Sequence, residues 1–93
     1  MSNVINIDAL NSAGHEALCA WIRVNFIPRK TPNLQQTSYG LKHRYQSATG
    51  RYVDNDQFKR AMLECGFLPV NPREQNQFYC ISKRSPALAY RCV

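Results

Sequence analysis

Residues 54–66 carry the sequence DNDQFKRAMLECG, which predicts a complete amphipathic helix with its own start and stop. Asp54 and Gln57 have the spacing of a capping box, in which two side chains satisfy free N–H groups of the first turn. The apolar positions recur at i, i+3, i+4 and i+7, and they are Phe58, Ala61, Met62 and Cys65. Gly66 suits the left-handed residue that ends many helices. The stretch therefore predicts a helix near residues 55–65 with one face in the core.

A first helix is predicted well upstream, from about residue 13 to residue 25. Its apolar positions at helical spacing are Ala17, Leu18, Trp21 and Ile22. Pro28 prevents its continuation, because proline lacks the N–H group and clashes with the preceding turn. The segment 28–33 holds a second proline, Pro32, and is expected to be a loop.

A second helix is predicted between these two. Thr37 or Ser38 can cap its start, and Gly50 suits the position just past its end. Its shared apolar face comprises Leu41, Tyr45 and Ala48. The helix is short, near three turns.

The segments 67–70 and 78–82 predict two short strands around a polar turn at 71–77. Pro69 cannot donate to a ladder, so the first strand has to be an edge. The whole order predicts a mainly α, α+β fold: a winged helix-turn-helix with a three-helix core and a short β-hairpin. The expected core comprises Leu18, Trp21, Ile22, Leu41, Tyr45, Phe58, Met62, Phe67, Leu68, Phe78 and Ile81.

A length of 93 residues fits one domain. The expected parts are an N-terminal arm over 1–11, a domain over 12–85 and a loosely packed C-terminal tail over 86–93. No stretch approaches the ~20 apolar residues that span a bilayer, and residues 1–8 lack the pattern of a secretory signal. We therefore expect a cytoplasmic protein without membrane contact.

Twelve Lys and Arg residues against six acids give a net charge of +6, which favours a polyanionic partner, nucleic acid first. Candidates for reading base edges lie on the third predicted helix: Asn55, Gln57, Lys59 and Arg60. A more basic group suits phosphate contacts and stacking: Arg29, Lys30, Tyr39, Lys42, His43, Arg44 and Arg51, with Tyr52 beyond. Arg73 in the turn, with Lys83 and Arg84 after it, can extend this surface. The alternative is a solvated helix face and scattered cations, with Tyr45 and Tyr52 in the core.

Catalytic and metal-binding patterns are weak. The sequence contains no Gly-rich phosphate loop and no Ser-His-Asp signature, and its two histidines are far apart, so a non-enzyme is expected. Four cysteines show no two-residue spacing, and packed thiols are favoured. A metal site of Cys65, Cys80, Cys92 and His43 fits the ligand types alone. No metal or cofactor is expected.

Several motifs carry a family resemblance: Trp21-Ile22, FIPRKT at 26–31, TSYGLKH at 37–43, FKRAM at 58–62 and Gly66-Phe67. Over residues 15–85 the chain resembles the winged-helix domain at the C-terminal end of phage and plasmid primase-helicase proteins, and small stand-alone proteins of mobile elements. The resemblance implies that the helix at 55–65 approaches the DNA major groove and that residues 71–77 contact the backbone.

Two functions follow as hypotheses. The first is nucleic-acid binding, DNA above all, in replication or in transcription control of a phage or mobile element. The second is a phage-encoded inhibitor that binds a host enzyme or defence complex, as anti-CRISPR proteins do. The balanced charge of the third helix and Leu63 on its outward side favour the second. A homodimer is compatible with either.

Overall fold

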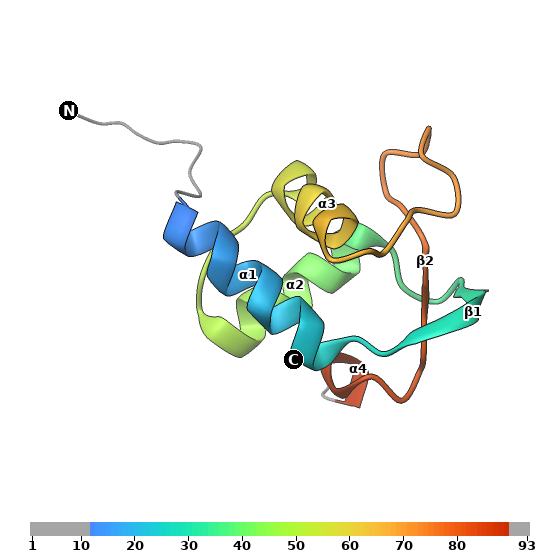
Figure 1. Cartoon of the computed structure of the whole chain (residues 1–93), viewed down its shortest axis with the longest axis horizontal. Coiled ribbons are helices and arrows are strands. Elements are labelled where there is room, and N and C mark those ends of the chain that lie inside the picture. The colour runs from blue at the N-terminus through green and yellow to red at the C-terminus, as the bar shows by residue number, and fades with distance from the viewer. Residues whose placement is uncertain (1–11, 90–93) are drawn as a thin grey trace.

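Four helices and a two-stranded antiparallel sheet make up the part of the chain that the structure describes, residues 12–89 (Figure 1). In this computed structural model the order is α1 (Ser12–Asn25), β1 (Pro28–Asn33), α2 (Ser38–Thr49), α3 (Asn55–Glu64), β2 (Tyr79–Ile81) and α4 (Pro86–Ala89). The result is a small, mainly helical α+β fold. Within residues 12–89, no helix is long and apolar enough to cross a lipid bilayer.

The three predicted helices are confirmed. The predicted signals at both ends of α3 and at the end of α2 are present, whereas Thr37 at the start of α2 makes no side-chain capping hydrogen bond. The Asp54 side chain accepts a hydrogen bond from Gln57 N at 2.7 Å, and Gln57 Oε1 accepts one from Asp54 N at 3.0 Å. This completes the capping box of α3. Gly50 follows α2 with φ 74°, and Gly66 follows α3 with φ 90°. A side chain at either glycine would be strained, because L residues rarely adopt this left-handed conformation.

The loop predicted at 28–33 is wrong, because this segment forms β1, the strand that pairs with β2. A two-stranded sheet leaves each strand one free edge, so prolines are tolerated there. Pro28 lies opposite Ile81 and Asn33 opposite Tyr79, so five residue steps of β1 match two of β2. The extra residues of β1 form an irregular bulge.

The hairpin predicted between residues 67–70 and 78–82 is only half present. Residues 79–81 form β2, but residues 67–70 form no strand. A backbone hydrogen bond from Val70 N to Phe78 O, at 2.9 Å, joins the two segments. The strand that pairs with β2 is therefore β1, and residues 67–70 contribute this single backbone contact.

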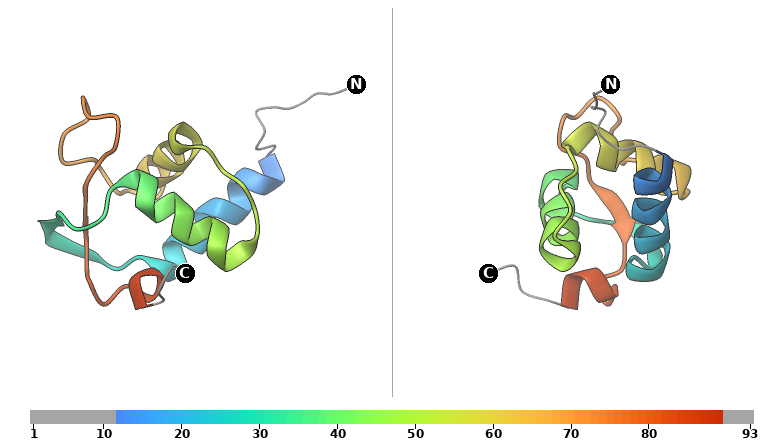
Figure 2. Two further views of the ribbon diagram at one scale, coloured as in Figure 1. Left: turned by 180° about the vertical axis from the view of Figure 1, so that it is seen from behind. Right: turned by 90° about the vertical axis from the view of Figure 1, so that its left-hand side faces the viewer.

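The core lies among α1, α2, α3 and β2; in the right-hand view of Figure 2, α1 and α2 flank β2. Most predicted core residues are buried: Leu18, Ile22, Leu41, Tyr45, Phe58, Met62 and Ile81. Trp21 and Phe67 are half-buried against this core. Ala61, on the apolar stripe predicted for the third helix, is also buried. The core further includes residues that the sequence did not indicate: Cys19, Phe26, Val53, Tyr79 and Ala87.

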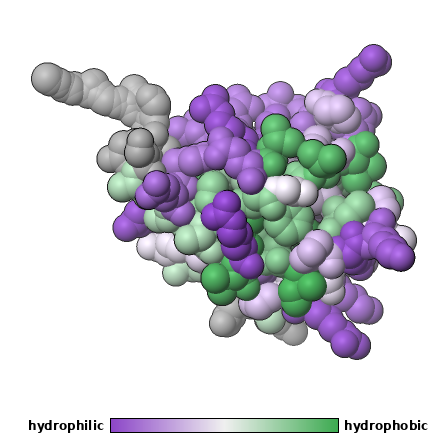
Figure 3. Space-filling model, in the orientation of Figure 1, coloured by the Kyte–Doolittle hydropathy of each residue, from purple (hydrophilic) through white to green (hydrophobic). Residues whose placement is uncertain are grey.

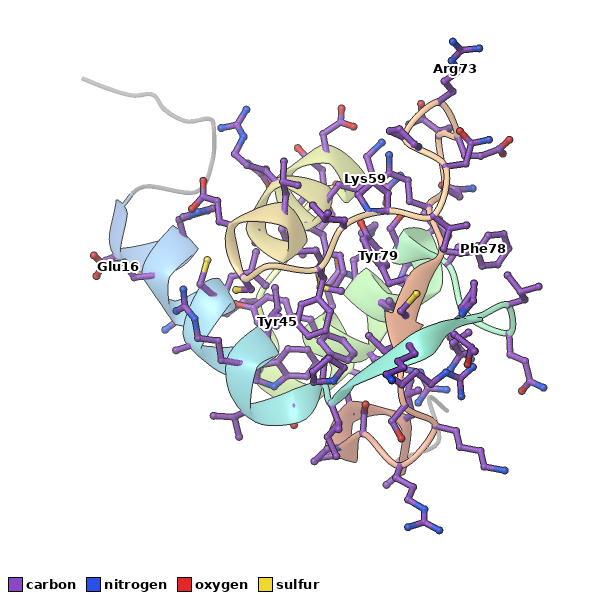
Figure 4. The ribbon with its side chains drawn as sticks, turned by 45° about the vertical axis from the view of Figure 1, so that its right-hand side comes forward. Glu16, Tyr45, Lys59, Arg73, Phe78 and Tyr79 are labelled. Carbon is purple, nitrogen blue, oxygen red and sulfur yellow. The ribbon has the colours of Figure 1, made fainter. Side chains whose placement is uncertain are left out.

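Two predicted core residues are misplaced. Leu68 is 68% exposed, because its segment does not join the sheet. Phe78 points outward in Figure 4, whereas Tyr79 points into the core. Successive residues of a strand face opposite sides, so Phe78 and Ile81, three residues apart, cannot both face inward.

The start of the predicted loose tail is packed. Residues 86–89 form α4, which contacts both α1 and α2, and Ala87 is buried. Just before it, the buried Ser85 hydroxyl accepts a hydrogen bond from Ile27 N at 2.8 Å. These contacts place residues 85–89 in the core assembly. The predicted arm over 1–11 and the end of the tail, 90–93, lie outside the described residues.

Candidate nucleic-acid interface

Two exposed tyrosines flank the ammonium group of Lys42 beside α2. Lys42 Nζ lies 5.0 Å from the ring centroid of Tyr39 and 5.4 Å from that of Tyr52. Tyr39 is 50% exposed and Tyr52 is 70% exposed. The His43 ring lies edge-on to Tyr39, with ring centroids 4.6 Å apart. We call Tyr39, Lys42, His43 and Tyr52 the tyrosine–lysine cluster.

Local geometry explains how α2 builds this cluster. Lys42 and His43 follow Tyr39 by three and four residues, so both lie one turn after it on the same side of the helix. The left-handed turn at Gly50 reverses the chain, and Tyr52 thereby reaches Lys42 from outside the helix. The cluster therefore combines a helix face with the segment that follows the helix.

Gln46 fixes both halves of the cluster. Its Oε1 atom accepts a hydrogen bond from Lys42 Nζ at 3.1 Å and another from Val53 N at 3.2 Å. Val53 is fully buried, so it anchors the segment that carries Tyr52. Gln46 was not among the predicted site residues, although its position one turn after Lys42 could have indicated it.

Two aromatic rings and an amide oxygen surround the buried ammonium group of Lys42. Lys42 is only 5% exposed, yet no carboxylate pairs with it among the described residues. The facing rings instead stabilise its ammonium group through cation–π contacts. Residues 17–53 contain no Asp or Glu but hold six of the twelve Lys and Arg residues. Exposed Arg51, next to Tyr52, adds to this field.

The predicted base-reading residues of α3 are mostly engaged by the chain itself. Asn55 Nδ2 donates to Gln75 O and to Asn76 Oδ1, both at 3.1 Å. Lys59 Nζ donates to Gln75 O at 2.9 Å and lies 3.3 Å from Asp56 Oδ1; Figure 4 shows it between α3 and the loop. Gln57 belongs to the capping box.

Arg60 differs from these three residues. Its side chain is exposed, with no polar partner in the described chain. The loop over 71–77 therefore covers the first half of α3 and leaves Arg60 free.

The other predicted cations are spread over several elements. Arg29 folds back onto the bulge of β1, where Nε donates to Thr31 O and Nη2 to Pro32 O, both at 2.8 Å. Arg44 Nη1 donates to Ala87 O at 3.2 Å, so it faces α4. Arg73 projects from the tip of the loop in Figure 4. Three further cations are exposed on β1 or in the turn before α4: Lys30, Lys83 and Arg84.

An open groove of about 570 Å³ lies between α3 and the segment that follows it. Its lining comprises Lys59, Arg60, Leu63, Leu68, Pro69, Pro72 and Gln77. Hydrophobic side chains gather on this face in Figure 3, and Leu63 is 53% exposed. Sequence reasoning placed Leu63 outward but did not anticipate that Leu68 would join it.

The four candidate metal ligands named from the sequence do not form a site among the described residues. Cys92 lies outside the described residues, and Cys65, Cys80 and His43 form no common group there. The His, Cys and acidic side chains that do gather are His15, Cys19 and Glu64. The three described cysteines are free thiols. Burial, and then the neighbouring Cys19, raises the pKa of Cys65 to about 11, so this thiol is protonated at neutral pH.

No protein-family model matches this chain, and neither a curated protein nor a solved structure is significantly similar to it.

Proposed function

We propose that this chain is a nucleic-acid-binding protein that acts through the tyrosine–lysine cluster. The observation that carries the proposal is the placement of Lys42 between two exposed tyrosine rings. Exposed aromatic rings offer stacking surfaces for bases, and positive charge attracts phosphates. Both features occur here at one place, in a region of the sequence free of acids.

The exposed rings favour unpaired bases as the ligand. Tyr52 turns towards Lys42 and stays 70% exposed, so much of its ring is open to a base. A base that is paired and stacked in a duplex does not offer its face to such a ring. Arg51 lies beside Tyr52 and is exposed, which suits a contact with the neighbouring phosphate. The ligand class is therefore single-stranded nucleic acid or a frayed end.

The winged helix-turn-helix assignment belongs to the same proposal. Its support is the order α2, link, α3 and then β2, with Val70 bonded to Phe78 where a wing would begin. In that frame Arg60 and Arg73 supply additional phosphate contacts on the α3 side. The cellular processes that we propose for this binding are replication or transcription control of a phage or mobile element.

A protein-binding role is the second candidate, and the groove beside α3 favours it. Exposed Leu63 and Leu68 give the groove an apolar lining, and Lys59 and Arg60 border it. Apolar surface bordered by charge is typical of protein contact sites. An inhibitor of a host enzyme or defence complex would use this groove rather than the tyrosine–lysine cluster.

The test is fluorescence anisotropy with labelled single strands and duplexes at low and physiological salt. We expect single strands to bind better than duplexes, with affinity falling about tenfold or more as salt rises. Tyr52→Ala should weaken binding about 5-fold to 150-fold, because a stacked base contributes ~1–3 kcal/mol. Leu68→Ala, also at an exposed site, is the matched control and should bind as the unmodified chain does.

Absence of binding to every nucleic acid at low salt would refute the proposal. A partner recovered from lysate after nuclease treatment, and lost on Leu63→Ser, would instead favour the protein-binding role. Equal loss of nucleic-acid affinity in Tyr52→Ala and Leu68→Ala would show that the tyrosine–lysine cluster is not the binding site.

A further inference from the structure

Three side chains with metal-binding atoms meet between α1 and the end of α3. His15 and Cys19 lie four residues apart, on the same face of α1, and Glu64 is the last residue of α3. His15 Nε2 lies 2.8 Å from Glu64 Oε1 and 3.6 Å from Cys19 Sγ. One ligand atom from each residue lies within 4.8 Å of the others.

The separation of His15 and Cys19 fits the ligand shell of one tetrahedral ion, and a movement of the Glu64 side chain would complete it. With Zn–N bonds of about 2.0–2.1 Å and Zn–S bonds of about 2.3 Å, nitrogen and sulfur ligands lie about 3.5 Å apart. The distance between His15 Nε2 and Cys19 Sγ is 3.6 Å. The distance to Glu64 Oε1, 2.8 Å, is that of a hydrogen bond, and a nitrogen–oxygen ligand pair would lie about 3.4 Å apart. The Glu64 side chain is 52% exposed and has room for this adjustment.

We infer that His15, Cys19 and Glu64 form a binding site for a zinc-class divalent ion. Imidazole, thiolate and carboxylate together suit zinc and its spectroscopic substitute cobalt better than magnesium or calcium. Three protein ligands leave the fourth tetrahedral position to a water molecule.

Binding changes the protons and contacts of the site in a defined way. Cys19 releases its thiol proton to solvent and binds as thiolate. His15 donates its Nε2 proton to Glu64 in the metal-free chain. On binding, this proton leaves Nε2 for solvent, or moves to Nδ1 when the ring is neutral, and the freed Nε2 lone pair binds the ion in place of the hydrogen bond to Glu64. His15 is 26% exposed and Glu64 52% exposed, so an ion can arrive from solvent while Cys19 stays buried.

The bound ion would fasten α1 to the end of α3. Ligands that bind the folded chain and not the unfolded chain raise its thermal stability. The site involves neither Tyr39, Lys42 nor Tyr52, so its failure would leave the proposed function unaffected, and the reverse also holds.

Cobalt titration of the reduced, full-length chain tests the inference. We expect one equivalent of Co²⁺ to produce the visible bands of tetrahedral cobalt and a thiolate-to-cobalt charge-transfer band. Zinc should bleach both, and one equivalent of zinc should raise the melting temperature.

Variants assign the bands to residues. His15→Gln and Glu64→Gln change partly exposed side chains and should weaken cobalt binding about tenfold or more. Loss of a residue that only hydrogen-bonds to a metal ligand already lowers metal affinity by about tenfold, and these variants remove the ligands themselves. Cys19→Ser should abolish the charge-transfer band. His43→Gln and Cys80→Ser are matched controls and should titrate as the unmodified chain does. The inference is overturned if no tetrahedral bands form, or if they survive His15→Gln and Glu64→Gln at full affinity, or if they depend on Cys80.

Discussion

α2 and α3 are short, well-terminated helices on the same core, but their polar faces have different surroundings. On α3, Asn55 and Lys59 bind the carbonyl of Gln75, and the loop over 71–77 covers them. On α2, Lys42 binds Gln46 and two aromatic rings, which leaves the outer sides of Tyr39 and Tyr52 in solvent. A polar helix face in a sequence is therefore not by itself a free surface.

The comparison also separates two kinds of binding surface. The α2 side offers aromatic rings and positive charge, which suit a nucleic acid. The α3 side offers an apolar groove bordered by Lys59 and Arg60. Variants that act on one side alone can therefore test which surface binds.

The largest expected effect concerns the core on which both helices rest. Phe58→Ala removes a fully buried ring of α3 that packs edge-on against Phe26, with ring centroids 6.4 Å apart. The variant should lose ~3–5 kcal/mol of unfolding free energy, much of the total for a small domain. Urea denaturation measures this loss. Trp21→Ala should cost less, because Trp21 is only half-buried, and an equal or larger loss would show that the core is centred elsewhere.

A smaller effect is expected at Gln46, which joins the two halves of the α2 surface. Gln46→Ala leaves Val53 N and Lys42 Nζ without the oxygen they share, and should cost ~1–3 kcal/mol of stability. Binding of single strands should also weaken, although Gln46 itself need not touch the ligand. Thermal melts and anisotropy on the same samples measure both effects. Lost stability with unchanged affinity would show that the tyrosine–lysine cluster does not bind the nucleic acid.

A third prediction concerns the contacts between the polar face of α3 and the loop over 71–77. Asn55→Ala combined with Lys59→Ala removes three hydrogen bonds to the loop over 71–77. Asn55 and Lys59 are half-buried under the loop, so loss of these bonds should lower stability by about 1–2 kcal/mol. If the α2 surface carries binding, affinity for single strands should stay within about twofold, against the larger loss in Tyr52→Ala. A tenfold loss in the double variant would reverse the comparison and place the ligand on α3.

The smallest effect is expected at Tyr45, in the core behind α2. Its hydroxyl is buried and finds no hydrogen-bond partner among the described residues. Tyr45→Phe removes this unsatisfied group and keeps the ring, which packs edge-on against Trp21 with centroids 5.2 Å apart. Stability should stay the same or rise by up to about 1 kcal/mol, as measured by thermal melting. A clear destabilisation would mean that the hydroxyl has a partner, such as a buried water.

Part of the candidate site was predictable from the sequence. Tyr39, Lys42 and His43 share a face at helical spacing, so their proximity follows once the helix is recognised. Tyr52 does not follow in this way, because its position depends on the turn at Gly50 and on the burial of Val53. The pair His15 and Cys19 also has a readable spacing of four residues, but only the fold brings Glu64 to it.

The sequence by itself determined the three main helices, both ends of α3 and the end of α2. Capping boxes, left-handed glycines and apolar stripes are interactions between residues at most a few positions apart, so local chemistry encodes them. The tertiary structure alone decided which strand pairs with β2, which face of α3 is covered and where a metal ion can bind. Those features join Pro28 to Ile81, Asn55 to Gln75 and His15 to Glu64. Contacts between such distant residues depend on how the whole core packs, and no local pattern records them.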